Sequence, residues 1–323
     1  MKFKKLTAVV AIVAATTMLF TACGSSNTAK KDSYNIGVVQ LLEHPALDKA
    51  TEGFQDAVKD ELGDKAKVTV KNAQNEPANC TTIVSKFVND KVDLIMANAT
   101  PALQAAAQGT DSIPILGTSV TDYATALDIK DWTGKTGKNI SGTSDLAPLK
   151  DQADMIKEFA PNAKQVGLLY CSAEANSTYQ IKEISKYLKK LGMKYKEYSV
   201  ADSNDIQAVV TKACNECDIL YAPTDNTLAG STKTIENVVV SKKVPLIAGE
   251  ENICKGCGVA TLSISYYDLG YETGKMAAEI LKDGKDPADM EIRTAPKVTK
   301  EYNKKLCKKL GVKVPDGYKA IEE

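Results

Sequence analysis

The stretch that decides the fold is Val92-Asp-Leu-Ile-Met-Ala-Asn-Ala-Thr-Pro-Ala-Leu-Gln-Ala-Ala-Ala-Gln108. Its first part, Val92 to Ala97, is a short apolar run bounded by polar residues, which is typical of a strand buried on both faces. From Pro101 onward the residues are Ala, Leu and Gln, which favour a helix, and Thr100 suits the N-cap position before it. The stretch therefore predicts a strand, a tight turn and a helix N-terminus. Such a terminus can bind an anion with the help of the Thr100 hydroxyl, although Thr100 as a simple helix cap is the alternative.

The same alternation of strand-like and helix-like runs continues along the chain, and two halves resemble each other. The run from Val92 to Thr100 is echoed by Cys217-Asp-Ile-Leu-Tyr-Ala-Pro-Thr-Asp225, and Ile113-Pro-Ile-Leu-Gly117 is echoed by Val244-Pro-Leu-Ile-Ala248, in the same order. This predicts an α/β fold with two Rossmann-like lobes, built on parallel sheets and joined by a hinge. The ranges expected are a signal peptide at 1–22, a tether at 23–33, a first lobe at 34–144 plus 266–290, and a second lobe at 145–265 plus 291–323. Helices are expected at 228–240, 266–282 and 299–310, among others.

The first 22 residues have the composition of a targeting segment. Three lysines lie within the first five residues, and Leu6 to Phe20 is an apolar run too short for a transmembrane helix. The following Phe20-Thr21-Ala22-Cys23 resembles a bacterial lipobox, which implies that Cys23 is lipidated and starts the mature chain. An ordinary cleaved signal peptide with a chance cysteine is the alternative. We expect the protein to be lipid-anchored on the extracytoplasmic face of the cell membrane.

Composition excludes several classes of function. Lys plus Arg and Asp plus Glu number 41 each, so no excess of positive charge indicates a nucleic-acid partner. Arg293 is the single arginine, which disfavours polyphosphate ligands, and His44 is the single histidine, which excludes a metal site with several histidines. The sequence contains no nucleophile–base pair and no dinucleotide fingerprint, so we expect neither an enzyme nor a cofactor.

Polar residues follow each predicted strand, where open α/β sheets bind their ligands. The first-lobe turns offer Gln40 and Leu42 and then the hydroxyls of Thr100, Ser119 and Thr121. The second-lobe turns offer acids, amides and a hydroxyl, namely Glu174, Asn176, Ser177, Asp225 and Asn226. A zwitterion fits this division, with its carboxylate on the first lobe and its ammonium on Asp225 or Glu174. The alternative is that these turns are polar only because strand-to-helix turns contain caps.

Several blocks of the chain together resemble a known family. They are Gly37-Val-Val-Gln40, His44-Pro-Ala-Leu-Asp48, Ala99-Thr-Pro-Ala102, Val120-Thr-Asp122, Ile140-Ser-Gly-Thr-Ser-Asp145, Glu174-Ala-Asn-Ser177, Asp225-Asn226 and Asp268-Leu-Gly270. With them the chain is similar, nearly end to end, to ABC transporter solute-binding lipoproteins of the tryptophan/tyrosine-binding type, which have the type I periplasmic-binding-protein fold. The resemblance implies that Thr100 and its helix N-terminus hold a ligand carboxylate and that Asp225 holds the α-ammonium.

The cysteines form an unusual pattern. Cys214-Asn-Glu-Cys217 and Cys254-Lys-Gly-Cys257 are two C-x-x-C pairs. Four thiolates of this kind can bind one zinc ion, and in an exported protein they can instead form disulfides. Unpaired thiols that pack as small apolar residues are the third alternative.

The function expected is that of a solute-binding protein of an ABC importer. It would bind an amino acid, aromatic or bulky and apolar, by hinge closure of two lobes. Its partners would be a permease and its ATPase, its contact with the membrane would be the lipid anchor, and the protein would be monomeric. A sugar- or nucleoside-binding protein of the same fold and an extracellular sensor domain are the alternatives. The content of one Trp, five Phe and one Arg counts against the sugar and nucleoside ligands.

Overall fold

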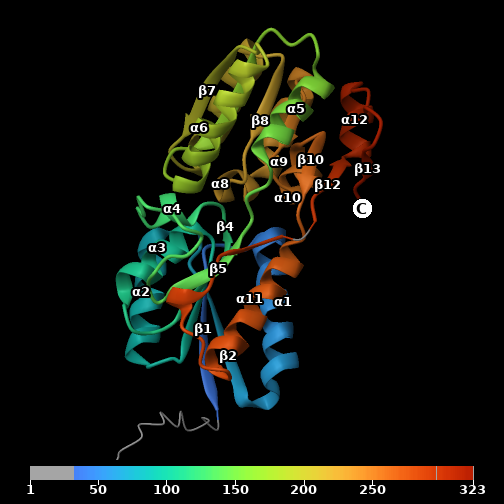
Figure 1. Ribbon diagram of the computed structural model, residues 1–323. Coiled ribbons are helices and arrows are strands. Elements are labelled where there is room, and N and C mark those ends of the chain that lie inside the picture. The colour runs from blue at the N-terminus through green and yellow to red at the C-terminus, as the bar shows by residue number, and fades with distance from the viewer. Residues whose placement is uncertain (1–32, 296, 323) are drawn as a thin grey trace, which may run out of the picture. The chain divides into compact units, whose positions relative to one another are not determined.

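The computed structural model describes residues 33–295 and 297–322, which form two sheets with helices on both faces of each (Figure 1). The first sheet has six strands in the order β11-β5-β4-β3-β1-β2, and the second has seven in the order β13-β12-β10-β9-β8-β6-β7. The strands of the first sheet are β1 (Tyr34–Gln40), β2 (Ala66–Asn72), β3 (Leu94–Asn98), β4 (Ile115–Val120), β5 (Ile140–Ser144) and β11 (Arg293–Thr294). Those of the second are β6 (Val166–Cys171), β7 (Tyr195–Val200), β8 (Ile219–Ala222), β9 (Leu246–Ala248), β10 (Ala260–Ser263), β12 (Thr299–Tyr302) and β13 (Lys319–Ala320).

The helices alternate with these strands. Those that pack on the first sheet or follow its strands are α1 (Pro45–Leu62), α2 (Pro77–Asn89), α3 (Thr100–Gly109), α4 (Tyr123–Ala126) and α11 (Tyr266–Leu281). Those of the second lobe are α5 (Leu149–Phe159), α6 (Ala175–Lys190), α7 (Ile206–Glu216), α8 (Asn226–Ala229), α9 (Thr232–Lys242), α10 (Glu251–Cys257) and α12 (Lys304–Leu310). Short 3-10 turns occupy Gly63–Lys65, Ser203–Asp205 and Pro287–Asp289. None of the helices in the described ranges is long and apolar enough to span a membrane.

Alternating side chains of the central strands explain why both faces of each sheet are covered. Along β1, Ile36 and Val38 pack with residues of α1 and α11, whereas Val39 packs with residues of α2 and α3. A strand that is apolar on both faces needs helices on both. The strands of the first sheet pair in parallel throughout, as the sequence predicts. The two-lobed α/β prediction is therefore confirmed.

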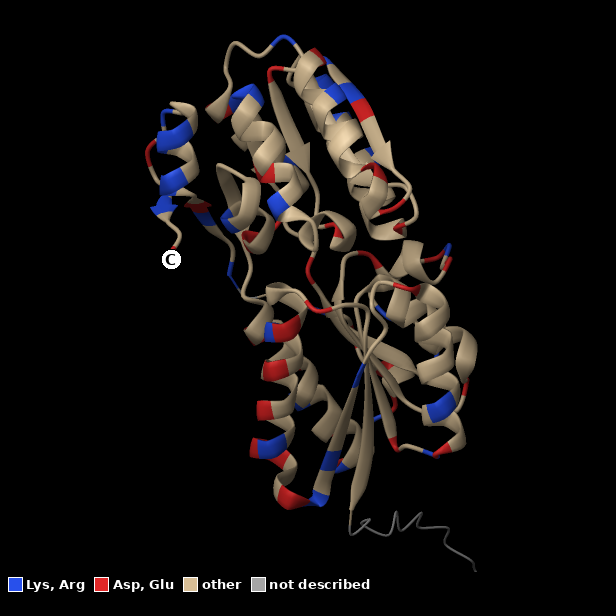
Figure 2. Ribbon diagram, turned by 180° about the vertical axis from the view of Figure 1, so that it is seen from behind, with Lys and Arg blue, Asp and Glu red and all other residues tan. Residues whose placement is uncertain are grey.

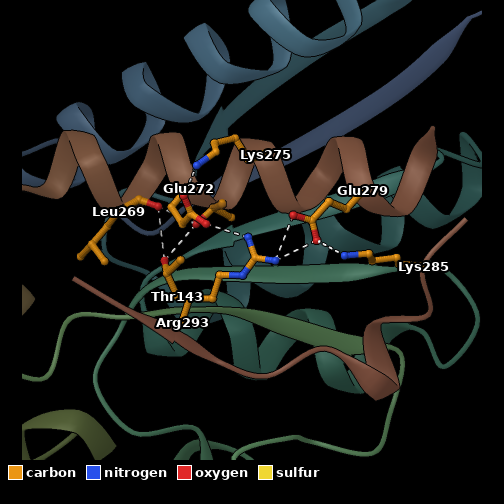
Figure 3. A network of polar contacts seen from close by, with 8 residues as sticks. Thr143, Leu269, Glu272, Lys275, Glu279, Lys285 and Arg293 are labelled. Carbon is orange, nitrogen blue, oxygen red and sulfur yellow. Dashed lines mark hydrogen bonds and ion pairs between the residues drawn. The ribbon is translucent and has the colours of Figure 1, made fainter. Parts of the chain in front are cut away.

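Helix α11 returns to the first lobe and packs unusually close to α1. A Cβ atom at Gly270 would lie 1.9 Å from the carbonyl oxygen of Ala50, and one at Gly53 would lie 2.1 Å from that of Tyr267. Glycine at both positions allows the two helix backbones to approach. On the other side of α11, Arg293 of β11 donates to Glu272 and Glu279 in the network of Figure 3. These contacts fix α11 to both α1 and the sheet edge.

The chain passes between the two lobes three times, after β5, after β10 and after β11. The first two crossings lie near the expected boundaries. The third differs, because we expected residues from 291 onward in the second lobe, whereas Arg293 and Thr294 pair with Thr143 and Ser144 of the first sheet. The sequence could not indicate this, since a two-residue strand has no periodicity of its own.

Two helix predictions need correction, and two short helices, α4 and α10, were not expected. The expected helix at 299–310 is a strand followed by a helix: β12 pairs antiparallel with β10, and the Asn303 side chain then accepts from the N–H of Leu306 to cap α12. The expected helix at 228–240 is divided at Gly230 and Ser231 into α8 and α9. Helix α10 was not expected at all, because seven residues are too few for a clear helical pattern.

Candidate functional site

The first lobe presents two hydroxyl groups at the carboxyl ends of β3 and β4. Strand β3 ends at Asn98, and α3 begins at Thr100. Between them lies Ala99, whose φ of 91° is rare for a residue with a side chain. The N-cap residue is therefore Ala99, which corrects the prediction that Thr100 caps the helix. The Thr100 Oγ1 atom is buried without a hydrogen-bond partner, and so is the Oγ atom of Ser119, which has a φ of 54°. Unusual backbone angles and unpartnered hydroxyls at one place are typical of a binding site.

In the second lobe, Asp225 ends the turn after β8 and connects three elements. One carboxylate oxygen accepts from the N–H of Leu228, at 2.9 Å, and so caps α8. The other accepts from the N–H of Cys171, at 2.6 Å, and from the Ser177 hydroxyl, at 2.7 Å. Three of about four acceptor positions are thus occupied by the protein, which leaves room for one further donor.

Glu174 is used differently, although it lies close by. Its carboxylate accepts five hydrogen bonds of 2.7–3.1 Å, from the backbone and side chain of both Asn226 and Thr227 and from the amide of Asn176. Five donors fill the acceptor capacity of a carboxylate. Glu174 therefore holds the start of α6 against α8, and of the two predicted ammonium partners only Asp225 has acceptor capacity left.

A cavity lies where the turns of the two lobes meet, and we call it the central cavity. It is lined by His44, Ala46, Leu47, Ser119, Thr121, Asp145, Asn176, Thr224, Asp225, Asn226, Ala229, Glu250 and Tyr266. His44 of the first lobe reaches Asn226 of the second, with its Nε2 atom 3.5 Å from the amide oxygen. The cavity is small: the centres of water-sized spheres can occupy about 10 Å³, which is room for about one water.

The predicted site residues divide into three groups. Ser119, Thr121, Asn176, Asp225 and Asn226 line the central cavity. Thr100, Glu174 and Ser177 are buried but are not part of its wall. Gln40 and Leu42 also lie outside the wall. The Gln40 side chain bonds Leu42, Asp48 and Thr51 within the first lobe, and Leu42 lies against Gly230 of the second.

Several lining residues were not among the predicted ones. Asp145 directly follows β5 and Glu250 lies two residues after β9, so the rule that ligands bind beyond strand ends could have found them. His44 and Tyr266 also line the cavity, although neither was a predicted site residue. Their place in the wall depends on contacts between distant parts of the chain: Tyr266 donates to Asp145 at 2.8 Å, and His44 faces Asn226.

The electrostatics of the central cavity are unusual. Asp145, Asp225 and Glu250 are at most 4% exposed, and the residues that line the cavity include no Lys or Arg. Burial is the main cause that raises the pKa of all three, that of Glu250 to about 7, and the nearby Glu174 raises the pKa of Asp225 further. Burial also lowers the pKa of His44, so that its ring stays neutral at pH 7. The Nδ1 atom of His44 and the amide oxygen of Asn176 have no hydrogen-bond partner. The wall is therefore rich in acceptors and suits a ligand that carries a positive charge.

The cysteines of the described residues belong to the hydrophobic cores. Cys214, Cys217, Cys254 and Cys257 are buried, unpaired thiols in one cluster of the second lobe. Burial raises the pKa of Cys214 to about 11 and that of the other three as well, so these thiols are poor nucleophiles and poor metal ligands. Within the described ranges, no group of three or more His, Cys, Asp or Glu residues is placed to hold a metal ion. Of the three alternatives, the structure has the unpaired thiols. Cys23 lies outside the described residues.

Comparison with known proteins gives consistent matches. Residues 35–320 match the family described as ABC transporter substrate binding protein. A tyrosine-binding protein of Clostridioides difficile (strain R20291) is 38% identical over 273 residues, which are 84% of this chain and 79% of that protein.

Two solved structures are similar over 90% of this chain. A Streptococcus pneumonia ABC domain in complex with L-Trp has a TM-score of 0.85 and 32% identity, with all of that chain covered. The ligand-free, open structure of a substrate-binding protein with adhesive properties from Clostridium difficile has a TM-score of 0.68 and 35% identity, with 99% covered. These relatives are ligand-binding proteins and not enzymes, and their fold is that of type I periplasmic binding proteins. The chain therefore belongs to the ABC transporter substrate-binding protein family.

Proposed function

We propose that this protein captures an amino acid with an aromatic or bulky apolar side chain and delivers it to the permease and ATPase of an ABC importer. The observation that carries the proposal is Asp225, a carboxylate 1% exposed, with acceptor capacity left and no basic residue in the wall it faces. A buried carboxylate of this kind is stabilised by a cation, and the α-ammonium of an amino acid supplies one. Relatives named for tyrosine and bound to L-Trp support an aromatic ligand.

The ligand carboxylate would bind on the first lobe. Thr100 and Ser119 have buried hydroxyls without partners, and Thr100 stands at the N-terminus of α3, a helix of ten residues. Helix N–H groups and hydroxyls together stabilise a carboxylate. The proposal thus divides the zwitterion between the lobes, which requires both of them for tight binding.

Binding would proceed by hinge closure. This chain is more similar to the L-Trp complex than to the ligand-free, open structure, although its sequence identity to the latter is slightly higher. A lower TM-score at equal coverage is what the same two lobes produce when the angle between them differs. A central cavity with room for about one water also supports a closed arrangement, which must open to admit an amino acid.

We further propose that Cys23 carries a lipid that anchors a monomeric protein on the extracytoplasmic face of the cell membrane. The apolar run before Cys23 and the lipobox-like Phe20-Thr21-Ala22-Cys23 support this. Mass spectrometry of the membrane-extracted protein tests it, since replacing Cys23 with Ser should leave residues 1–22 attached or release the protein from the membrane.

The substitution Asp225→Asn tests the amino-acid proposal, because asparagine keeps the cap of α8 and removes the charge. We expect calorimetry to give at least ~100-fold weaker binding of L-tyrosine and L-tryptophan, since removing one partner of a buried charge pair costs about 3 kcal/mol or more. Asp218→Asn is the matched control: Asp218 stands at the other end of β8 and accepts from the N–H groups of Lys164 and Gln165, away from the cavity. Unchanged affinity in Asp225→Asn would refute the ammonium site.

A further inference from the structure

A second, larger space lies beside the central cavity, and we call it the hinge-side hollow. Its walls include Pro45 and Tyr267 of the first lobe, Glu251 of the second, and Ile264 and Ala295 from two of the three crossings between lobes. Measured in the same way as the central cavity, it has about 510 Å³ against about 10 Å³. Three residues, Ala46, Glu250 and Tyr266, line both spaces, so the two are direct neighbours.

When the lobes are closed, a bulky ligand side chain needs a space of its own. The central cavity holds about one water-sized group, which is enough for an ammonium but not for a ring. The lobes are arranged more as in the L-Trp complex than as in the open, ligand-free relative. A ring attached to an ammonium near Asp225 must therefore lie in an adjoining space, and the hinge-side hollow shares a wall with the central cavity.

The chemistry of the shared wall suits an aromatic side chain with a polar tip. Tyr266 and Ala46 of the shared wall give apolar surface, and Ile264 adds to it within the hinge-side hollow. The Glu250 carboxylate is 4% exposed and accepts from two backbone N–H groups, those of Asn252 and Ile253, which leaves about two acceptor positions free. A donor such as a phenol O–H or an indole N–H would occupy one of them.

We propose that the hinge-side hollow is the compartment for the ligand side chain and that Glu250, at its boundary with the central cavity, accepts a hydrogen bond from the polar tip of an aromatic amino acid. This inference rests on the proposed function and adds to it the place and the chemical class of the side chain. Because both lobes and two crossings contribute walls, a ring bound there contacts both lobes at once and so favours the closed state.

Filling the hollow tests the inference. Ala295→Trp adds a ring from a partly exposed position, and Lys297→Trp adds one from the exposed rim. We expect each to weaken L-tyrosine and L-tryptophan binding by about tenfold or more in calorimetry, since a filled pocket rejects the ring. Lys305→Trp is the matched control, because Lys305 is an exposed lysine that lines a separate surface hollow near α12; it should bind as the unmodified protein does.

Glu250→Gln tests the hydrogen bond separately from the space. Gln keeps the size and an acceptor oxygen but removes the charge, so the preference for L-tyrosine over L-phenylalanine should fall by about tenfold while L-phenylalanine affinity changes little. Circular dichroism before each titration establishes that the variants are folded. Unchanged tyrosine affinity in both filling variants, with Asp225→Asn still abolishing binding, would overturn the side-chain compartment and leave the proposed function intact. Absence of binding of any aromatic amino acid to the unmodified protein would overturn both.

Discussion

Two groups of acidic side chains in this molecule, one partly exposed and one buried, have opposite electrostatic surroundings. In the Arg293 network, Arg293 donates to Glu272 at 2.6 Å and to both oxygens of Glu279 at 2.8 and 3.0 Å, while Lys275 and Lys285 add a second cation to each carboxylate (Figure 3). The acids of the central cavity, Asp145, Asp225 and Glu250, instead accept from hydroxyls and backbone N–H groups.

The effect on pKa follows this difference. The cations of the Arg293 network lower the pKa of Glu272 and Glu279 despite partial burial. In the central cavity burial raises the pKa of the three acids, since no cation offsets it. Figure 2 shows acidic and basic positions side by side along the outer helices, as in the pairs Lys49–Glu52 and Lys86–Asp90. These acids have cations within the chain, whereas Asp145, Asp225 and Glu250 are buried without one, so a cationic ligand would stabilise them.

The largest expected effect comes from giving the central cavity a cation of its own. Asn176→Lys would place an ammonium in the wall, beside Glu174 and Thr224, where the Asn176 amide now donates. This ammonium would compete with that of the ligand, so we expect L-tyrosine affinity to fall by at least ~100-fold. The folded protein should keep or gain thermal stability, because a buried negative charge is offset.

The matched control for this variant is Asn204→Lys, at an exposed position of the Ser203–Asp205 turn. It introduces the same charge at a position that does not line the central cavity and should change neither affinity nor melting temperature. Wild-type affinity in Asn176→Lys would mean that the acids of the cavity do not act on the ligand. The difference between these acids and those of the Arg293 network would then have no role in ligand binding.

A smaller effect, on stability alone, is expected at the Arg293 network. Arg293→Met removes the cation that joins β11 to α11 and leaves two carboxylates with one lysine each. We expect the free energy of unfolding in urea to fall by about 1–2 kcal/mol, the lower part of the range for charged hydrogen bonds, because these side chains are up to a third exposed. Ligand affinity should stay within about twofold. Lys86→Met, which breaks an exposed pair, should give no measurable change.

Local sequence patterns could predict some features of this molecule and not others. The run from Val92 to Gln108 gave the correct strand and helix because both follow from local apolar patterns. The helix expected at 299–310 was wrong, since the pairing of β12 with β10 joins residues far apart in sequence. The turns that carry the site were found because polar residues follow predicted strands.

The roles of individual residues within those turns could not be predicted. Glu174 and Asp225 are both acids in polar turns of the second lobe, and only the structure reveals that five donors surround the first and three the second. Likewise, the contact of His44 with Asn226 spans 182 positions and depends on how the lobes meet. The number of donors around a carboxylate depends on residues that are close in space but distant in sequence, so no local sequence pattern indicates it.

The smallest expected effect is a pH dependence of affinity. Burial and the nearby Glu174 raise the pKa of Asp225 to about 8, so much of the free protein carries a protonated Asp225 at neutral pH, and a protonated carboxyl does not attract an ammonium. L-Tyrosine binding should therefore weaken by about 3- to 10-fold as the pH falls from ~8.5 to ~7, with proton release on binding measured by calorimetry in buffers of different ionisation enthalpy. The neutral His44 and the acids Asp145 and Glu250 face the same cavity. Comparison of the pH profile of Glu250→Gln with that of the unmodified protein separates the contribution of Glu250 from that of Asp225. Arg293→Met should show the same pH profile of affinity as the unmodified protein, because Arg293, Glu272 and Glu279 are not among the residues that line the central cavity. The ligand-free protein should show the opposite trend in stability: groups with raised pKa bind protons more tightly when folded, so their contribution is lost as the pH rises. Affinity that is flat with pH, or that rises as the pH falls, would show that the ligand does not pair its ammonium with Asp225.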